Sequence, residues 1–473
     1  MPGVKKPHVL QAVLPLLLLV VTAAFSILRW KAGMYVPLIA GITATALLGI
    51  YLGYSWKQLE TFMSEGVSRA LVAFFMLFII GAICGTWILS GVIPTLIYYG
   101  LAIINPSIFV PAVALTTGIL AIATGSSFTS IATVGLAFMA VGQGMGFPPA
   151  LIAGAVISGA YLGDKISPLS DTTNVAPAMV DTDLFSHVRH MMWDTIPAFA
   201  ISLALYWFLG MKYAGNTAHL EQVDQVMDAL KQTFNIQPLL LLLPVLTIVI
   251  MVKRLPAVPS LLLVSLLGGI AAMIFQGSTI TDVIQALTNG YTGKSGVATL
   301  DSLLQQGGIT SMFQTVGLLL LATALGGILE GTGVFKAVLE SIIKRARTTG
   351  SLILSTVVST LVIAFASGAQ FLAIILPARA FAGTYKERGL DTKNLSRCVE
   401  AAGTVGINLV PWSVPAVFAA NMLGVSPMEF IPYIFFAFLV PLFNVIYGYT
   451  GFSIAKKTYP ETARPANAKA DLT

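Results

Sequence analysis

Two aspartates and a lysine interrupt a long apolar stretch of this sequence, and their placement indicates ion chemistry. Asp164, Lys165 and Asp171 lie inside the segment 148–179, which is otherwise mostly apolar. An ionisable side chain at bilayer depth is costly unless it faces a charged partner or a wet cavity, so such residues are functional candidates. Side-chain oxygens surround them, contributed by Ser167, Ser170, Thr172, Thr173 and Asn174.

Pro168 lies in the middle of this polar stretch and breaks a helix there, because proline lacks a backbone donor. The break frees backbone carbonyls, which together with carboxylate and hydroxyl oxygens form a site suited to Na⁺. A carboxylate can hold either Na⁺ or a proton, and this competition is the minimum requirement of an antiporter. We predict a Na⁺ site at Asp171 and Asp164. Asp171 is ranked first because hydroxyls flank it, whereas Asp164 has Lys165 beside it as a salt partner. The alternative is a loop that dips to the membrane interface and pairs Asp164 with Lys165.

Three other apolar segments are also interrupted by small and polar residues. Segments 109–141 and 351–382 each break at a four-residue tip, where hydroxyls and helix ends could attract ions. These tips are Thr124, Gly125, Ser126 and Ser127 in the first, and Ser367, Gly368, Ala369 and Gln370 in the second. Segment 394–422 breaks across residues 406–413, where the candidates are Asn408, Pro411, Trp412 and Ser413. A tight turn that needs glycine is the structural alternative for the tips.

A constant spacing relates these breaks to one another. Adding 243 to the residue number takes Gly125 to Gly368 and Pro168 to Pro411. Interrupted segments in corresponding places of two halves are the best sequence indication of a transporter's binding site. The second break has no carboxylate, so any ion binding there has to depend on residues of the first half. Supporting roles are considered for Lys165, Glu330 and Glu400, and Glu400 is expected to pair with Arg397 in a structural role.

Composition predicts which elements position these residues. The chain has 473 residues, of which 56% are apolar and 10% charged, and its mean hydropathy is +0.86. A soluble chain carries about 25% charged residues, so a soluble enzyme and a disordered chain are excluded. Apolar runs long enough to cross a hydrocarbon core of roughly 30 Å predict an all-α polytopic membrane protein. The net charge of +6 fits cytoplasmic loops rather than nucleic-acid binding. No cofactor is expected, since two cysteines and four histidines form no metal-binding spacing.

Topology follows if segments 109–141 and 351–382 are re-entrant hairpins. Arms of about 14 residues reach roughly 21 Å and cannot cross the membrane. About ten transmembrane helices then result, in two inverted repeats, each with a re-entrant hairpin and a broken helix. Placing both termini in the cytoplasm puts 20 of the 26 Lys and Arg residues inside, which is a strong positive-inside bias. We predict a multi-pass protein of a prokaryotic cytoplasmic membrane.

The chain divides into five predicted parts. They are N-terminal helices with an interfacial helix (1–69), the first inverted repeat (70–211), an external loop with linking helices and a second loop (212–310), the second inverted repeat (311–455) and a polar cytoplasmic tail (456–473). We expect hairpins and broken helices to move together as a transport unit, because a site of irregular backbone must stay enclosed by protein while its access changes. The remaining helices would form a scaffold, which could also be the interface of a homodimer.

The polar run from Gly163 to Asn174 resembles the signature of the NhaC-type Na⁺/H⁺ antiporter family. The resemblance continues in the second half through residues 394–397, Glu400, residues 403–404 and residues 411–412. It implies Na⁺/H⁺ exchange, coupled in some relatives to organic acids such as malate and lactate. The chain departs from the family pattern at Ala401, at Ser413 and at the second hairpin tip. These departures concern the co-transported species and leave the ion site intact.

Three alternatives remain open from the sequence. A Na⁺-coupled symporter or exchanger of an organic acid or amino acid would reuse the same broken helices, although Lys165 is the one central cation for an anionic substrate. An intramembrane aspartyl protease is disfavoured, because its aspartates lie on separate helices whereas Asp164 and Asp171 share one segment. A channel would not need two asymmetric half-sites. The expected partners are Na⁺, protons and the lipid bilayer, with a small organic acid as an option.

Overall fold

The computed structural model describes residues 4–458, except 31, 104, 169, 214–217, 253–256, 298–299, 302–303 and 306. For a few helical residues, Thr124 among them, only the backbone is described. The described part of the chain is built from helices, apart from an isolated β-bridge between Leu390 and Lys456. The side chain of Thr124, predicted to belong to the first hairpin tip, therefore lies outside the described residues.

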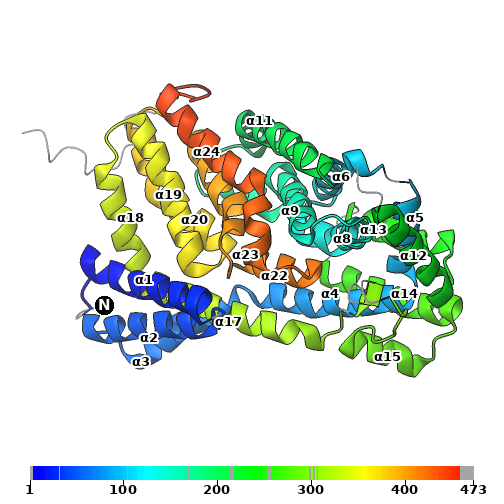
Figure 1. Cartoon of the computed structure of the whole chain (residues 1–473). Helices are drawn as coiled ribbons and strands as arrows, with labels where there is room; N and C mark the ends of the chain where they lie inside the picture. Colours follow the sequence, from blue (N-terminus) through cyan, green and yellow to red (C-terminus); the bar gives the residue numbers. More distant parts are fainter. Residues whose placement is uncertain are drawn as a thin grey trace, which may run out of the picture.

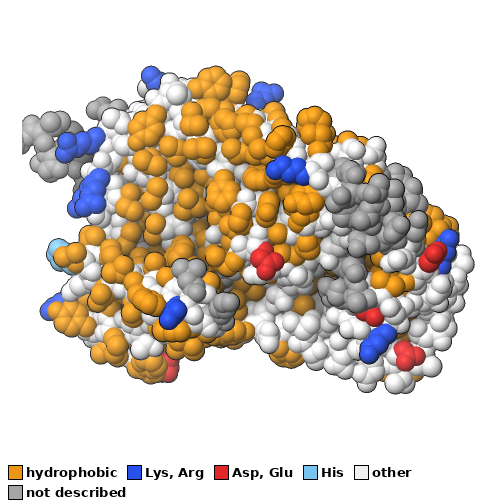
Figure 2. Space-filling view, viewed as in Figure 1, with side chains coloured by type: hydrophobic (Ala, Val, Ile, Leu, Met, Phe, Trp, Pro, Cys, Tyr) orange, Lys and Arg blue, Asp and Glu red, His pale blue; other side chains and the backbone are white. Residues whose placement is uncertain are grey.

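The helices confirm a polytopic membrane protein. Within the described residues, seven helices are long and apolar enough to cross a membrane, and up to eleven spans result if each sharply bent pair counts as one. The predicted number of about ten falls in this range. Apolar side chains cover much of the surface in Figure 2, with few charged side chains among them, as expected for a surface that faces lipid.

The molecule has two layers in the view of Figure 1. One layer, along the bottom, contains α1 (Val9–Ala24), α2 (Tyr35–Leu52), α3 (Trp56–Ser68), α4 (Leu71–Leu89), α14 (Ala257–Gln276), α15 (Ile280–Asn289) and α17 (Phe313–Gly331). The layer above it contains α6 (Phe109–Thr124), α8 (Leu136–Gly144), α9 (Pro149–Ile166), α11 (Leu184–Met211), α19 (Thr349–Ser367), α20 (Gln370–Glu387) and α24 (Phe435–Thr450). Every predicted hairpin and broken helix belongs to this upper layer. The connecting helices α5 (Val92–Ile103), α12 (Ala218–Thr233), α13 (Leu242–Val252) and α18 (Val334–Arg345) lie toward its two ends.

The order of elements repeats at the spacing that the sequence predicts. Helix α6 ends at Gly125 and α19 ends at Gly368, and both glycines have a left-handed backbone, with φ of 69° and 61°. A left-handed cap is accessible to glycine at little cost. The short helices α10 (Asp171–Ala178) and α22 (Val414–Leu423) begin after Ser170 and Ser413, again 243 residues apart. The two halves therefore share one plan of hairpin and broken helix.

The hairpin arms are longer than predicted, so the expected arm length of about 14 residues is wrong. Helix α19 has 19 residues and α20 has 18. A capping box between Thr348 and Ser351 starts α19 ahead of the apolar run, and α20 continues through polar residues to Glu387. The argument that short arms cannot cross the membrane no longer applies, and re-entry of the hairpins stays a prediction.

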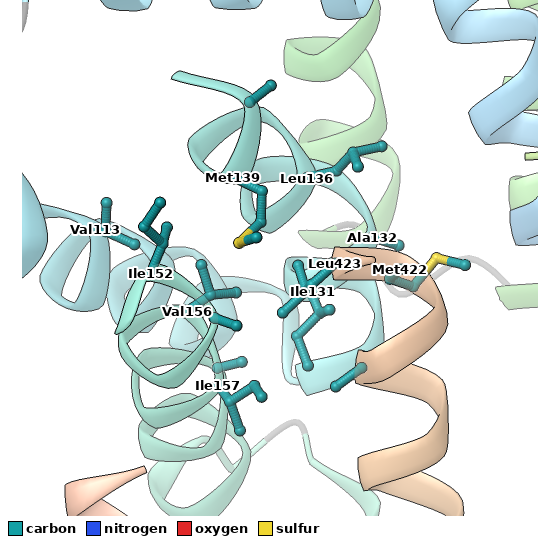
Figure 3. Close-up of a cluster of buried hydrophobic side chains, with 14 of the residues drawn as sticks. Val113, Ile131, Ala132, Leu136, Met139, Ile152, Val156, Ile157, Met422 and Leu423 are labelled. Carbon is teal, nitrogen blue, oxygen red and sulfur yellow. The ribbon is translucent and has the colours of Figure 1, made fainter. Parts of the chain in front are cut away.

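A buried apolar cluster joins the first hairpin to elements of both halves. Figure 3 shows Ile131 and Leu136 of the hairpin beside Val156 of α9 and Met422 and Leu423 of α22. These side chains are all buried. Where the contact removes apolar area from water, it is stabilised by about 25 cal/mol per Å². Where the same side chains would otherwise face lipid, close packing stabilises the contact instead. The cluster holds the second arm of the first hairpin against α22 of the second half.

The long helices of the lower layer pack across the two halves. Helix α4 contacts α14 and α15 of the second half, and α17 contacts α2 and α3 of the first. Glycines permit the closest approach: a Cβ added to Gly85 would lie 2.1 Å from the carbonyl oxygen of Ala286, and one added to Gly66 would lie 2.3 Å from that of Thr323. A side chain cannot occupy that space. Each half thus supplies the partners of the other half's long helix.

Candidate functional site

The break in the first broken helix lies between α9 and α10. Helix α9 ends at Ile166, Ser167 has an extended backbone, and α10 begins at Asp171 after an extended Ser170. Pro168 has no N–H to continue the helix, and the residue before a proline avoids the helical conformation. The predicted break is therefore present, and it leaves Asp164 near the end of α9 and Asp171 at the first position of α10.

The carboxylate of Asp164 is enclosed by hydroxyls from two elements. Asp164 is buried, with 8% of its surface exposed. Ser127 Oγ of the first hairpin tip donates to Oδ2 at 2.7 Å, and Ser170 Oγ donates to Oδ1 at 2.6 Å. Thr172 Oγ1 lies 3.0 Å from Ser170 Oγ. A hydroxyl can donate to a carboxylate or rotate and offer lone pairs to a cation, so this arrangement can accommodate both a bare carboxylate and a bound ion.

Three of the predicted ligands contact backbone carbonyls instead. Thr173 Oγ1 donates to the carbonyls of Asp164 and Lys165, at 2.7 and 3.0 Å. Asn174 Nδ2 donates to the carbonyls of Pro168 and Ser170, at 2.8 and 2.7 Å, and Ser167 Oγ donates to that of Ile122 at 2.7 Å. Carbonyls freed by a helix break need such partners when water is excluded. In this structure these three side chains stabilise the break.

Asp171 is exposed, although its neighbours Thr172 and Thr173 are buried. It occupies the first turn of α10, where a negative charge is favoured by the helix dipole. The packing therefore gives Asp164 the more enclosed and more fully hydrogen-bonded carboxylate. The ranking of Asp171 above Asp164 stays a prediction from sequence.

Lys165 does not pair with Asp164, and that expectation is wrong. Its Nζ lies 3.1 Å from Oδ1 of Asp194 on α11, and both side chains are fully buried. Adjacent residues on a helix point about 100° apart, so Asp164 faces the hairpin while Lys165 faces α11. Asn444 Nδ2 on α24 donates to Oδ2 of Asp194 at 2.5 Å, and Arg397 Nε donates to Oδ1 of Asn444 at 2.9 Å.

Glu400 lies near the ion site and does not pair with Arg397. It ends α21 (Thr392–Glu400) and is fully buried. Its Oε1 accepts from Thr404 Oγ1 at 2.8 Å, whereas Oε2 is buried without a hydrogen-bond partner. The carboxylate interacts electrostatically with Asp164 and Lys165. The expected structural ion pair with Arg397 is therefore wrong, because Arg397 binds Asn444 and Ser453.

The second break is built around main-chain contacts. Trp412 Nε1 donates to the carbonyl of Phe365 at 2.8 Å, and Ser413 Oγ caps α22 by accepting from the N–H of Ala416 at 3.2 Å. The N–H of Val414 donates to the carbonyl of Gly368 at 2.9 Å, which fixes the second hairpin tip to the break. Pro411 lines a cavity of about 380 Å³ between α17 and α22.

Four buried polar atoms in this region have no hydrogen-bond partner. They are Tyr161 Oη, Gln370 Nε2, Glu400 Oε2 and Asn408 Oδ1. Tyr161 interacts electrostatically with the Asp164 carboxylate, while the Gln370 amide lies near Asp164 and the Asn408 amide near Tyr161, in each case without a formed hydrogen bond. A buried polar group without a partner is costly and indicates that a water, ion or ligand completes the site. Residues from both halves thus surround Asp164.

The remaining candidates have structural contacts. Glu330 on α17 forms a partly exposed ion pair with Arg69 at 2.5 Å. Ser126 caps α7 (Ser127–Ser130) by accepting from the N–H of Thr129. Ser367 Oγ donates to the carbonyl of Ile363 and accepts from the N–H of Ala369. These serines shape the two hairpin tips.

Sequence reasoning missed Tyr161 and Asp194. Tyr161 lies one helical turn before Asp164, so it shares the face of α9 that carries the carboxylate. Asp194 precedes the apolar run 195–211 and lies in a polar stretch that is typical of a membrane interface. The signal that could have identified it is the spacing of His187, His190 and Asp194, which places three polar side chains on one face of α11. All three are buried.

Comparison with known proteins agrees with the predicted family. The model of the Na⁺/H⁺ antiporter family matches residues 7–173 and 159–452. The Na⁺/H⁺ antiporter NhaC of Alkalihalophilus pseudofirmus is 36% identical over 442 residues, covering 93% of this chain and 94% of that protein.

Two further relatives are named for other substrates. A malate-2H⁺/Na⁺-lactate antiporter of Bacillus subtilis is 38% identical over 405 residues, covering 86% of each chain. The arginine/ornithine antiporter ArcD of Halobacterium salinarum is 36% identical over 461 residues, covering 97% of this chain and 95% of that protein. Family model and relatives span nearly the whole sequence, including both broken helices. The chain belongs to the NhaC-type Na⁺/H⁺ antiporter family.

Proposed function

We propose that the protein exchanges Na⁺ for H⁺ across the cytoplasmic membrane, with the Asp164 carboxylate binding the two ions alternately. The observation that carries this proposal is the enclosure of Asp164 by two rotatable hydroxyls, Ser127 from the hairpin tip and Ser170 from the break. When Na⁺ binds, the hydroxyls turn their lone pairs to the ion. When a proton binds, the neutral carboxyl keeps its hydrogen bonds to them. One carboxylate cannot hold both ions at full occupancy, and this competition couples their movements.

The second half contributes to the same site under this proposal. Glu400 supplies a second carboxylate with an unpartnered oxygen, and Asn408 and Tyr161 supply neutral oxygens without partners. Hard oxygen ligands of this kind suit Na⁺. Asp171, exposed at the start of α10, attracts cations to the entrance of the site in this scheme.

The experiment that tests the exchange is a proteoliposome assay with a pH-sensitive dye. A Na⁺ gradient should drive proton movement through the wild-type protein, and Asp164→Asn should abolish it. Asp228→Asn is the matched control, because Asp228 is an exposed aspartate on α12. Full Na⁺-dependent proton movement in Asp164→Asn would refute the assignment.

We further propose an elevator-type movement, in which the upper layer of Figure 1 moves as a transport unit against α4 and α17. Small residues line one boundary of this unit. A Cβ at Gly368 would lie 3.3 Å from Cβ of Ala322 on α17, and one at Gly326 would lie 3.1 Å from Cβ of Ser367. A smooth boundary of small side chains permits sliding of one layer over another.

A disulfide across this boundary tests the movement. Cysteines at Gly326 and Ser367 would have Cβ atoms 3.1 Å apart, so a shift of a few tenths of an ångström brings them to the separation of about 3.5–4.5 Å that a disulfide needs. Oxidation of the double variant, with Cys84 and Cys398 replaced by alanine, should stop exchange, and reduction should restore it. The single variants give the reference rates. Unchanged exchange after complete oxidation would favour local gating instead.

The proposed orientation places both termini in the cytoplasm and the loop 212–237 outside. A cysteine at Gln232, exposed on α12, should react with a membrane-impermeant maleimide added to intact cells. A cysteine at Thr348, which caps α19, should react only after the membrane is opened. Asn216, in the same loop, is a further position for external labelling and lies outside the described residues. The reverse labelling pattern would overturn both the orientation and the inversion of the repeats.

A second candidate function is exchange that includes an organic substrate. Its support is the relatives named for malate and lactate and for arginine and ornithine. Counterflow of radiolabelled malate, lactate, arginine and ornithine into proteoliposomes, each with and without Na⁺, tests it. Uptake of one of these compounds that depends on Asp164 would extend the proposed function, and Na⁺/H⁺ exchange without such uptake would exclude these four substrates.

A further inference from the structure

A buried ion pair lies next to the proposed ion site but is separate from it. The Lys165 ammonium and the Asp194 carboxylate are 3.1 Å apart, and both side chains are fully buried. Their helices, α9 and α11, pack against each other. Removing one partner of a buried pair leaves an uncompensated charge, which is far more costly than the pair itself. Each residue therefore holds the charged group of the other in its position.

Asp194 is held firmly in its position by its own neighbours. Thr195 Oγ1 donates to Oδ1 at 3.2 Å, and Asn444 Nδ2 donates to Oδ2 at 2.5 Å. Arg397 in turn donates to the Oδ1 atom of Asn444 at 2.9 Å. Both carboxylate oxygens are thus fixed by contacts from α11 and α24. A carboxylate fixed in this way provides a stationary anchor for a flexible lysine side chain.

Two carboxylates other than that of Asp194 lie near Lys165. Its backbone is adjacent to Asp164, and its carbonyl is held by Thr173. The Lys165 charge already interacts with the Glu400 carboxylate. Among the residues that the structure describes, Lys165 also interacts electrostatically with His187 and His190 on α11 and with Cys398 on α21. None of these three attracts a cation as a carboxylate does, so Asp164 and Glu400 are the alternatives to Asp194.

We infer that Asp194 is a positioning residue that holds the Lys165 ammonium away from the ion site. Without it, the lysine turns toward Glu400 and Asp164 and acts as a tethered cation that competes with Na⁺. The inference rests on the proposed function of Asp164, and it adds a requirement for Na⁺ affinity. The Lys165–Asp194 pair keeps the negative charge of the site available to the transported ions.

Asp194→Asn in proteoliposomes tests this inference through the Na⁺ concentration that gives half-maximal exchange. We expect this concentration to rise about tenfold, because a competing charge with charge-assisted hydrogen bonds has to be displaced. The maximal rate at saturating Na⁺ should fall much less. The double variant Lys165→Met with Asp194→Asn removes the competitor together with its anchor, so it should return half-saturation to within about threefold of wild type. Asp194→Glu should also retain the wild-type affinity.

Specific outcomes would overturn the inference. Asp194→Asn with a reduced maximal rate but unchanged half-saturation would show a purely structural role. If the double variant needs as much Na⁺ for half-maximal exchange as Asp194→Asn does, Lys165 is not the competitor. If Asp194→Asn fails to assemble, as judged by size-exclusion chromatography, the double variant alone decides by the same threefold limit. Failure of the proposed function is recognised separately, because it requires that Asp164→Asn still exchanges Na⁺ for protons.

Discussion

The two broken helices share a backbone plan but differ in the chemistry that they carry. In the first, Asp164 lies one turn before the break and receives hydroxyls from Ser127 and Ser170. In the second, Trp412 and Ser413 contact the main chain. A buried acidic residue of the second half, Glu400, lies more than one turn ahead of the break, on a segment that continues as π- and 3₁₀-helix. The repeat therefore provides two similar scaffolds, of which the first carries the proposed ion site.

This difference shows how a duplicated fold can become functionally asymmetric. The first half positions a carboxylate where its hydroxyl partners can rotate. The second half uses the same break to lock the hairpin tip at Gly368 to Val414, and it contributes Glu400 and Asn408 from the side. Substitutions near the two breaks should therefore have unequal effects, and four predictions test that expectation.

Asp164→Asn should have the largest effect. Loss of a buried carboxylate that exchanges cations should lower Na⁺-dependent proton movement by about 100-fold or more. The measurement is the initial rate of dye response after a Na⁺ pulse to proteoliposomes. Detergent-purified protein of unchanged elution volume controls for assembly. A rate above one tenth of the wild-type rate would contradict this comparison of the two halves, because the first half would then not carry the main ion site.

Glu400→Gln should have the next largest effect. The change keeps the size and the contact with Thr404 but removes the second negative charge, and we expect the Na⁺ half-saturation concentration to rise about tenfold. Glu330→Gln is the matched control, because its ion pair with Arg69 is partly exposed, whereas Glu400 is fully buried. Equal effects of these two variants would show that Glu400 has no special relation to Asp164.

Asn408→Ala should have a moderate effect. Its Oδ1 has no partner while its Nδ2 donates to the carbonyl of Val405 at 3.1 Å. Loss of a neutral ligand should weaken Na⁺ binding about fivefold. Isothermal titration of Na⁺ into purified protein measures this change directly. Asn421→Ala, another amide bonded to a helix carbonyl, should leave Na⁺ binding unchanged, and a loss in both variants would point to stability instead.

Asp171→Asn should have the smallest effect on exchange. The residue is exposed, so the lost interactions are those of a surface charge with the dipole of α10 and with incoming cations, which amounts to less than about threefold in rate. The effect should shrink further at high ionic strength, because exposed charges are screened. A loss as large as that of Asp164→Asn would restore the sequence-based ranking and reverse the roles of the two aspartates.

The positions of the breaks could be predicted because local chemistry determines them. Proline at position 168, glycine at the hairpin tips and a constant spacing of 243 residues each act on the backbone within a few residues. The structure confirms the two hairpins, the two broken helices and their order. The membrane-spanning character of the chain could also be predicted from the sequence, since it depends on composition and on the length of apolar runs.

The partners of the charged side chains could not be predicted, because they come from helices far apart in sequence. Lys165 contacts Asp194, and Arg397 contacts Asn444. Sequence proximity favoured Asp164 and Glu400 for these two cations, whereas helix geometry directs neighbouring side chains to different faces. Likewise, Ser167 and Thr173 read as ion ligands by type, and only the folded break shows that backbone carbonyls need them first.

The exchanged packing of α4 and α17 constrains how the chain is assembled during synthesis. Helix α4 presents Gly81 and Gly85 to residues near Gly308 and Ala286, which the ribosome makes much later. Helix α17, by contrast, emerges when its partners α2 and α3 are already in the bilayer. The glycine-lined face of α4 therefore has no protein partner until the second half has been synthesised and inserted. Two fragments divided within the loop 212–237 should each be unstable alone and should recover a stable complex when they are produced together.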